Sequence, residues 1–291
     1  MASQEEQFTH AVMCSFDVTA EPLMRSQANA SLEALRQAEE GWSFCLQMFA
    51  SAHEEHVKFW CLQTVTDMVV RQRRYESLPE ERKQQMRTAL LTWLQQKGQP
   101  QTDEPASIKN KFAQLLVTVL RHDYPTHWPD AFSQLLGTLH SGPVSIDLFL
   151  RMLNAVHEEV VVNEEGNGYD SSVAGRVKDG MRERCLPQLA EAWLTILRLH
   201  ESAPALSVAC LGTVESYVSW IPIGLVANGP WLQLLQSFLR SKSEALHEGA
   251  CAVLGEIVVK RMEAPSKMEH LTNLGIVPML SAGLGSQAQA A

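Results

Sequence analysis

The sequence lacks the long uncharged apolar runs that cross membranes. In its 291 residues no stretch of 18 apolar residues is free of charge, so we expect no membrane insertion. The amino-terminal segment contains Glu5, Glu6, Asp17 and Glu21 and no basic run, which is unlike a secretory signal. These two absences argue against a membrane-spanning or secreted protein.

The sequence also lacks the motifs of common catalytic and cofactor sites. None of its six cysteines forms a C-x-x-C pair, and most lie among apolar residues, which is typical of reduced, buried thiols in a nuclear or cytosolic protein. No G-x-S-x-G elbow, no G-x-x-x-x-G-K-[ST] phosphate loop and no catalytic pair of carboxylates at a strand end occurs. We therefore predict a protein that is not an enzyme and binds no metal or cofactor.

Excess positive charge is absent as well. The formal net charge is −9, so any contact with nucleic acid must come from a local basic cluster rather than from the field of the whole chain. An acidic surface suits a basic protein partner better. With 45% hydrophobic and 20% charged residues, the chain has the composition of a globular protein.

Helical apolar stripes take the place of strand alternation, which no segment shows over any length. The clearest stripe puts five apolar side chains on one helical face, at Ile108, Phe112, Leu115, Leu116 and Val119. Pro125 ends this helix and Pro129 opens the next, because proline fits a first helical turn and breaks a helix interior. One helix, a proline corner and a second helix make one unit of a helical repeat.

Such units recur along the chain and predict its fold. We expect first helices to begin near Ser26, Glu55, Ser107, Ser145, Pro204 and Ser243. We expect second helices to begin near Gly41, Pro79, Thr126, Val173, Ile223 and Pro265. Pro187 should kink or split the long helix that begins near Val173. A lone amphipathic hairpin cannot bury its apolar face, so we predict an all-α, right-handed α-solenoid of about six HEAT-type helical hairpins.

The segment from Ile108 to Phe132 resembles the signature of the importin-β-like nuclear export receptors, in which an amphipathic helix leads into a Tyr-Pro-x-x-Trp-Pro corner. The residues that carry this resemblance, to which we assign mainly structural roles, are Ile108, Lys109, Asn110, Lys111, Phe112, Tyr124, Pro125, Trp128 and Pro129. Four further stretches, 56–63, 147–153, 181–187 and 217–221, resemble the branch of the family that exports tRNA. The resemblance covers residues 20 to 280.

This resemblance implies a receptor that binds Ran in its GTP form together with tRNA cargo, passes nuclear pore proteins and shuttles between nucleus and cytoplasm. It places much of the Ran surface on the inner, second helices of the amino-terminal repeats. It also implies a division of the chain. We expect an amino-terminal segment (1–24), importin-β amino-terminal-like repeats (25–100), exportin-type repeats (101–282) and a disordered or truncated tail (283–291).

Two basic clusters are candidates for contact with Ran or tRNA. Our sequence pairing puts both on second helices, the first at Lys83 and Arg87, the second at Arg176, Lys178, Arg182 and Arg184. The alternative for each is an ordinary solvated helix face, which is the usual fate of charge runs.

The function has two readings from different classes. The first is an export receptor of the family above, acting by binding alone. The second is a HEAT-type scaffold that docks proteins without regard to nucleotide state. One local question stays open beside them. Lys109 and Lys111 lie at the start of a helix, where the helix dipole disfavours positive charge. They need either an acidic neighbour in the adjacent repeat or a binding partner.

Overall fold

A computed structural model describes residues 3–70, 74–97, 104–162, 171–273 and 275, and among these residues every regular element is helical. The chain forms two compact units, Met1–Ala174 and Gly175–Ala291. The first unit contains α1 (Gln4–Phe16), α2 (Pro22–Gln37), α3 (Gly41–Ser51), α4 (Glu55–Val70), α5 (Arg74–Ser77), α6 (Glu80–Lys97), α7 (Ala106–Asp123), α8 (Ala131–Gly137), η2 (Thr138–Ser141), α9 (Pro143–His157) and η3 (Glu158–Val162). Helix α10 (Ser171–Arg184) begins at the end of this unit.

The second unit continues with α11 (Leu186–Leu197), α12 (Pro204–Val218), η4 (Ile223–Leu225), α13 (Gly229–Leu239), α14 (Glu244–Val259) and α15 (Ala264–Asn273). Local sequence explains several of the boundaries. Ser3 and Glu6 form a reciprocal capping box at the start of α1. Proline occupies the first turn of α2, α9, α11, α12 and α13. Pro187 separates α10 from α11, as predicted.

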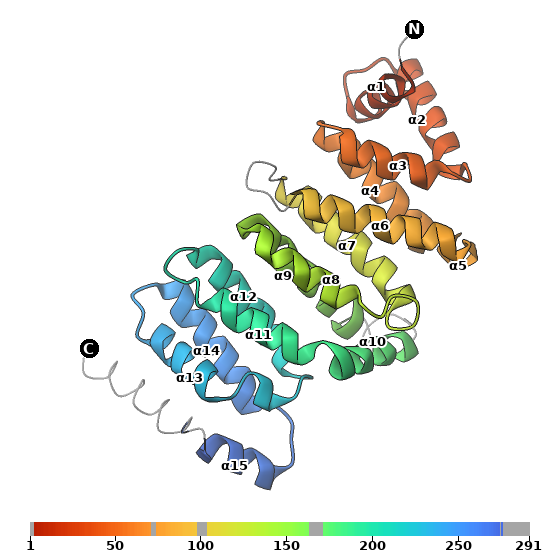
Figure 1. Ribbon diagram of the computed structural model, residues 1–291. Coiled ribbons are helices and arrows are strands. Elements are labelled where there is room, and N and C mark those ends of the chain that lie inside the picture. Colours follow the sequence, from red (N-terminus) through yellow and green to blue (C-terminus); the bar gives the residue numbers. More distant parts are fainter. Residues whose placement is uncertain (1–2, 71–73, 98–103, 163–170, 274, 276–291) are drawn as a thin grey trace. The chain divides into compact units, whose positions relative to one another are not determined.

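Helical hairpins build each unit, which confirms the predicted all-α solenoid of about six hairpins (Figure 1). The right-handed sense of the stack stays a prediction. The division at residue 100 lies outside the described residues, as does the tail at 283–291, and the family domains at 25–100 and 101–282 also stay predictions.

The pairing of helices within the hairpins was wrong by one helix. Helix α3 packs far more extensively against α4 than against α2. Helix α13 likewise packs more extensively against α14 than against α12. The hairpins are therefore α1–α2, α3–α4, α6–α7, α11–α12 and α13–α14, together with one in which α8 continues into η2 and η2 packs on α9. Three residues separate α3 from each neighbour, 38–40 from α2 and 52–54 from α4, so packing and not the length of the connection decides this pairing. By contrast, α5 and its flanking residues separate α4 from α6.

This correction changes which helices count as second helices. In the first unit they are α2, α4, α7 and α9, and α4 packs on α7 as α7 packs on α9. Helices α3 and α6, which the sequence pairing made second helices, are first helices and pack on one another. The first unit thus has two layers, seen in Figure 1 as α3 and α6 lying over α4 and α7.

Aromatic side chains pack between the two layers of the first unit. The ring centroid of Trp93 lies 4.7 Å from that of Phe49 and 4.2 Å from that of Phe112. All three side chains are buried. This cluster joins α3, α6 and α7, so the signature helix is held from the opposite layer by large apolar contacts.

Candidate functional site

The apolar residues of the family signature lie in the core. Ile108, Phe112 and Tyr124 are fully buried, and Trp128 is 4% exposed. The Trp128 indole Nε1 donates a hydrogen bond to Gln134 Oε1 at 2.9 Å. Tyr124 and Pro125 are joined by a cis peptide bond. These residues shape the corner between α7 and α8.

The polar residues of the signature helix bind to α9. Lys109 Nζ lies 2.7 Å from Asp147 Oδ2, which answers the open question about this lysine in favour of an acidic neighbour in the adjacent repeat. Arg151 Nε donates to Asp147 at 3.0 Å, and Arg151 Nη1 donates to Asn110 Oδ1 at 2.6 Å. Burial raises the pKa of Asp147, but the hydrogen bonds from Arg151 and Lys109 outweigh burial and leave that pKa lowered.

The same edge of α7 lines an open groove of about 550 Å³ across α4, α7 and α9, which we call the polar groove. Its walls carry Phe59, Ser107, Asn110, Lys111, Ala113, Gln114, Arg151, Asn154, Ala155, Glu158 and Glu159. Lys111 Nζ donates to Gln114 Oε1 at 2.9 Å and lies 6.0 Å from the ring centroid of Phe59. The groove lies on second helices and ends at the π-helical turn η3, a geometry often found at functional sites.

Arg87 is engaged inside the protein. Its side chain is 8% exposed, and its guanidinium donates to Asp123 Oδ2 and Glu80 Oε1, each at 2.5 Å. Tyr75 Oη donates to the same Asp123 oxygen at 2.5 Å. The hydrogen bond from Arg87 lowers the pKa of Glu80, whereas burial raises the pKa of Tyr75. This geometry gives Arg87 a structural role in fixing α5, α6 and α7.

Lys83, the other cation of this cluster, is half-buried at the edge of the network. Its Nζ donates to the Glu76 carbonyl at 3.3 Å and lies 5.4 Å from the Tyr75 ring centroid. Lys83 and Arg87 lie on α6, which is a first helix rather than a second one. The structure therefore brings them together with Tyr75 and Asp123, and not with the polar groove.

The basic cluster of α10 is open to solvent. Arg176, Arg182 and Arg184 are exposed and Lys178 is half-buried. Arg182 Nη1 donates to Asp179 Oδ1 at 2.6 Å, and the Arg182 guanidinium lies 5.7 Å from the Trp220 ring centroid. The charge on this helix is thus partly balanced within the helix itself.

Lys260 joins this cluster in space, and no sequence pattern indicated that it would. Its Nζ donates to the carbonyls of Val218 and Ser219, at 2.7 and 2.8 Å, so it caps the end of α12. Burial and then the charge of Arg182 lower the pKa of Lys260. Arg182 Nη2 donates to the carbonyl of Trp220 at 3.4 Å, and this carbonyl follows that of Ser219 along the chain, so the two cations bind neighbouring peptide groups.

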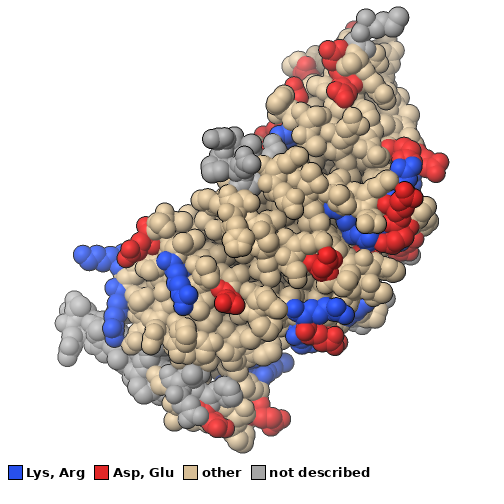
Figure 2. Space-filling model, viewed as in Figure 1, with Lys and Arg blue, Asp and Glu red and all other residues tan. Residues whose placement is uncertain are grey.

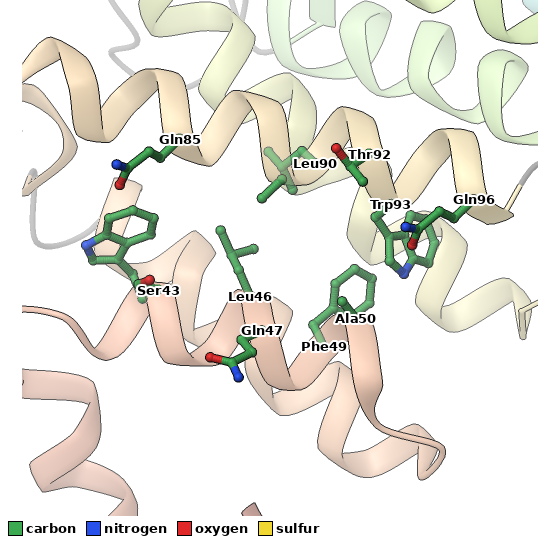
Figure 3. Close-up of a pocket in the computed structure, with 12 residues that line it drawn as sticks. Ser43, Leu46, Gln47, Phe49, Ala50, Gln85, Leu90, Thr92, Trp93 and Gln96 are labelled. Carbon is green, nitrogen blue, oxygen red and sulfur yellow. The ribbon is translucent and has the colours of Figure 1, made fainter.

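A second groove, of about 340 Å³, lies between α3 and α6 on the first-helix layer of the same unit. Figure 3 shows Leu46, Phe49, Leu90 and Trp93 from the two helices, with the amides of Gln47, Gln85 and Gln96 nearby. None of the residues that line it is charged. The buried Trp93 Nε1 has no hydrogen-bond partner. This groove suits an apolar group and has no titratable side chain for acid–base chemistry.

Within the described residues, no helix is both long and apolar enough to cross a membrane. The same residues bring no three His, Cys, Asp or Glu side chains together in the way that a metal ion requires.

Comparison with known proteins places this architecture in a family. A family model described as "Exportin 1-like protein" matches residues 105–254, which include the signature helix, the polar edge on α9 and most of α14. Exportin-T of Arabidopsis thaliana is 34% identical over 275 residues, covering 91% of this chain and 28% of the relative. Exportin-T of Mus musculus is 34% identical over 258 residues, covering 86% and 26%.

Exportin-T of Homo sapiens is 33% identical over 256 residues, again covering 86% of this chain and 26% of the relative. The chain therefore spans about a quarter of the length of the relatives it matches. The family match extends over more than half of the chain and includes the residues that build its signature corner. The chain belongs to the exportin 1-like family of nuclear export receptors.

Proposed function

We propose that this chain is part of a nuclear export receptor that binds Ran in its GTP form and tRNA, and carries the RNA from nucleus to cytoplasm. The observation that carries the proposal is the similarity to exportin-T over about nine tenths of the chain. The proposed receptor acts by binding alone, contacts nuclear pore proteins and shuttles between the two compartments.

The polar groove is the proposed contact surface for Ran. The family resemblance places Ran on second helices, and the observed pairing makes α4, α7 and α9 second helices of the first unit. Asn110 and Lys111 of the signature line the groove together with Arg151, Glu158 and Glu159. This mixture of amides and both signs of charge favours a folded protein partner, because a polyanion would be repelled by the two glutamates.

The four cations of α10 are the proposed contact for tRNA phosphates. Arg176, Lys178, Arg182 and Arg184 offer the local positive charge that a chain of net charge −9 needs for contact with RNA. Lys83 stays a candidate contact at the edge of α6. Arg87 would contribute indirectly, by holding α6 in place, since its guanidinium is already bound by two carboxylates.

The test is a binding titration of the chain with Ran loaded with GTP or with GDP. A receptor fragment should prefer the GTP form, because only that form is exported with cargo. Equal affinity for the two forms would contradict the proposal and favour the HEAT-type scaffold, which has no reason to distinguish nucleotide states. A variant that carries Lys111→Ala and Arg151→Ala should weaken binding to the GTP form if the polar groove is the contact.

A further inference from the structure

The sequence carries two Arg-x-x-Ser segments, Arg74–Ser77 and Arg240–Ser243. An arginine three residues before a serine is a charge pattern that one class of protein kinases recognises in its substrates. Both serines are exposed, so neither the pattern nor the exposure of the serine distinguishes the two segments. What distinguishes them is whether the arginine is already bound.

The arginine of the first segment is bound inside the fold. Arg74 Nη2 donates to the carbonyls of Ala38 and Glu39, at 3.0 and 3.3 Å, just beyond the end of α2. The hydroxyl of Ser77 donates to the Arg74 carbonyl at 2.9 Å. A kinase would have to pull Arg74 away from α2 before it could recognise this segment. The structure therefore hides the first pattern.

The second segment is open to an enzyme. Arg240, Lys242 and Ser243 are exposed in the short connection between α13 and α14. Within the described residues, no ion pair engages the side chain of Arg240 or Lys242. Figure 2 shows Lys and Arg side chains that project from the left edge of the second unit, where this connection lies in Figure 1. Ser243 has an extended backbone, with φ −80° and ψ 110°, which suits binding in an enzyme groove.

The hydroxyl of Ser243 lacks the role that other residues at helix starts have. Ser3 before α1 and Asn228 before α13 each accept a hydrogen bond from a backbone N–H of their helix, at 3.1 and 3.4 Å. Ser243 precedes α14 in the same way but makes no such bond. The hydroxyl of Ser241 is in use, because it accepts from the Ser243 N–H at 3.1 Å. Of these two serines, only Ser243 can react without giving up a bond of the fold.

We propose that Ser243 is a phosphorylation site for a protein kinase that recognises Arg240. In the reaction, Ser243 Oγ attacks the γ-phosphorus of ATP and forms an O–P bond. The bond between that phosphorus and the β–γ bridging oxygen breaks, ADP leaves, and the catalytic aspartate of the kinase takes the hydroxyl proton. This inference goes beyond the proposed function, which requires no covalent change of the chain.

A phosphate at Ser243 would change the charge and the stability of this edge of the second unit. It carries about −1.5 to −2 at pH 7 and would offset the two positive charges of Arg240 and Lys242. The dipole of the 16-residue α14 favours negative charge at its start, whereas Glu244 in the first turn opposes it. Because two cations and the dipole act against one carboxylate, we expect the first turn of α14 to be stabilised.

The test incubates the whole chain and its variants with ATP and calmodulin-dependent protein kinase II, a kinase of this specificity, and locates the phosphate by mass spectrometry. Ser243 is the only residue with a hydroxyl in the tryptic peptide 243–260. The parent and Ser241→Ala should be phosphorylated at Ser243, and Ser243→Ala should carry no phosphate in this region. Arg240→Ala should react on the order of tenfold more slowly, because the kinase loses a charge-assisted contact.

Free peptides provide the matched control for the effect of the fold. Peptides 71–83 and 237–249 contain the two patterns without the surrounding structure, so both should be phosphorylated. In the whole chain Ser243 should react, and Ser77 should react on the order of tenfold more slowly than Ser243. A Ser77 that reacts as fast as Ser243, or a phosphate on Ser241 in place of Ser243, would overturn the inference. So would a Ser243 that reacts in the peptide and not in the chain.

Hydrogen exchange measures the effect of the phosphate on α14. The His247 N–H, which donates to the Ser243 carbonyl at 3.1 Å, should exchange more slowly after phosphorylation, and the difference should shrink as salt is raised. Ser243→Ala taken through the same reaction is the control and should show no change. Unchanged or faster exchange in the phosphorylated chain would contradict the stabilisation, since repulsion by Glu244 would then outweigh the cations.

Discussion

The two compact units hold their helices together by different means. In the first unit, buried charged side chains are paired: Lys58 with Glu104, Arg87 with Asp123, and Lys109 with the half-buried Asp147. In the described residues of the second unit, the buried polar side chains are Ser207 and Thr213. Their hydroxyls donate to the carbonyls of Ile196 and Ala209, at 3.2 and 3.1 Å.

This difference indicates which substitutions should destabilise each unit. A buried ion pair adds little to stability when compared with an apolar pair of the same size, but losing one member is costly because the other charge stays buried. Each pair joins segments that are distant in sequence, so it also fixes which segment lies beside which. The second unit has no such requirement among its described residues and depends on the fit of apolar side chains.

The largest effect should come from breaking the pair that is most buried. Asp123→Ala removes one acceptor of Arg87 and the acceptor of Tyr75, and leaves the 8% exposed Arg87 side chain with Glu80, which is half exposed, as its carboxylate partner. We expect a loss of about 3–5 kcal/mol in the free energy of unfolding. Urea denaturation followed by circular dichroism measures it.

The matched control replaces both charges. Arg87→Met with Asp123→Leu should recover part of the lost stability, because no charge then remains buried there, whereas Tyr75 Oη still lacks the acceptor that Asp123 provided. Failure of the double variant to exceed Asp123→Ala would contradict the view that the buried charge of Arg87 causes the loss.

The corresponding change in the second unit is a cavity. Leu211 is fully buried on α12, where α14 comes close enough that a Cβ on Gly249 would lie 2.8 Å from Leu211 Cδ1. Leu211→Ala should cost about 2–4 kcal/mol, since the tight packing leaves little room for collapse. Denaturation monitored by hydrogen exchange of α12 and α14 measures it. If α7 and α9 lost their protection first, the units would not respond separately.

Sequence periodicity predicted most of the helices and the buried face of α7 because helix-forming stripes are local. Ile108 and Phe112 show this most clearly, since both are fully buried as their spacing requires. The pairing of the helices could not be predicted in this way. Links of three residues join α3 both to α2 (38–40) and to α4 (52–54), so the pairing depends on how well the helix faces pack and not on the stripes or the link length.

The candidate site was predicted only in part, for the same reason. The residue type of Arg87 predicted a surface cation. Its guanidinium instead donates a hydrogen bond to Asp123, which lies 36 residues away in the sequence. Lys109 needed Asp147, which lies on a different hairpin. Lys260 reaches Val218 across 42 residues. A charge run gives the position of the cations along the chain and says nothing of the distant partners that bury or expose them.

Lowering the pH should destabilise the first unit more than the second, by less than the substitutions above. The lowered pKa values of Glu80 and Asp147 mean that both carboxylates stabilise the first unit fully above their unfolded pKa of about 4. That contribution disappears as the pH falls through their folded values. The lowered pKa of Lys260 in the second unit belongs to a base, and stability changes there only at alkaline pH.

Hydrogen exchange at pH 7 and pH 3, corrected for the intrinsic rates, should therefore show that α7 and α9 lose more protection than α12 and α14. Equal loss in both pairs of helices would mean that the carboxylates of the first unit do not set its response to acid.

The smallest effect on stability should come from the exposed ion pair of α10. The side chains of Arg182 and Asp179 are 42% and 67% exposed, so Arg182→Ala should change the free energy of unfolding by less than about 1 kcal/mol. Urea denaturation of this variant beside Asp123→Ala measures the contrast between an exposed and a buried pair. A loss comparable to that of Asp123→Ala would contradict the distinction.

The same helix should matter for RNA although it matters little for stability. Removing one phosphate contact should lower the slope of log affinity against log salt by roughly 0.7 to 0.9. We therefore expect the fourfold alanine variant of Arg176, Lys178, Arg182 and Arg184 to fold like the parent while binding tRNA with a shallower slope. Lys242→Ala, which removes a cation from the loop before α14, is the control for net charge. If the slope and affinity of the fourfold variant equal those of the control, the basic helix is only a solvated face, and the second unit needs its surface charge neither for stability nor for RNA.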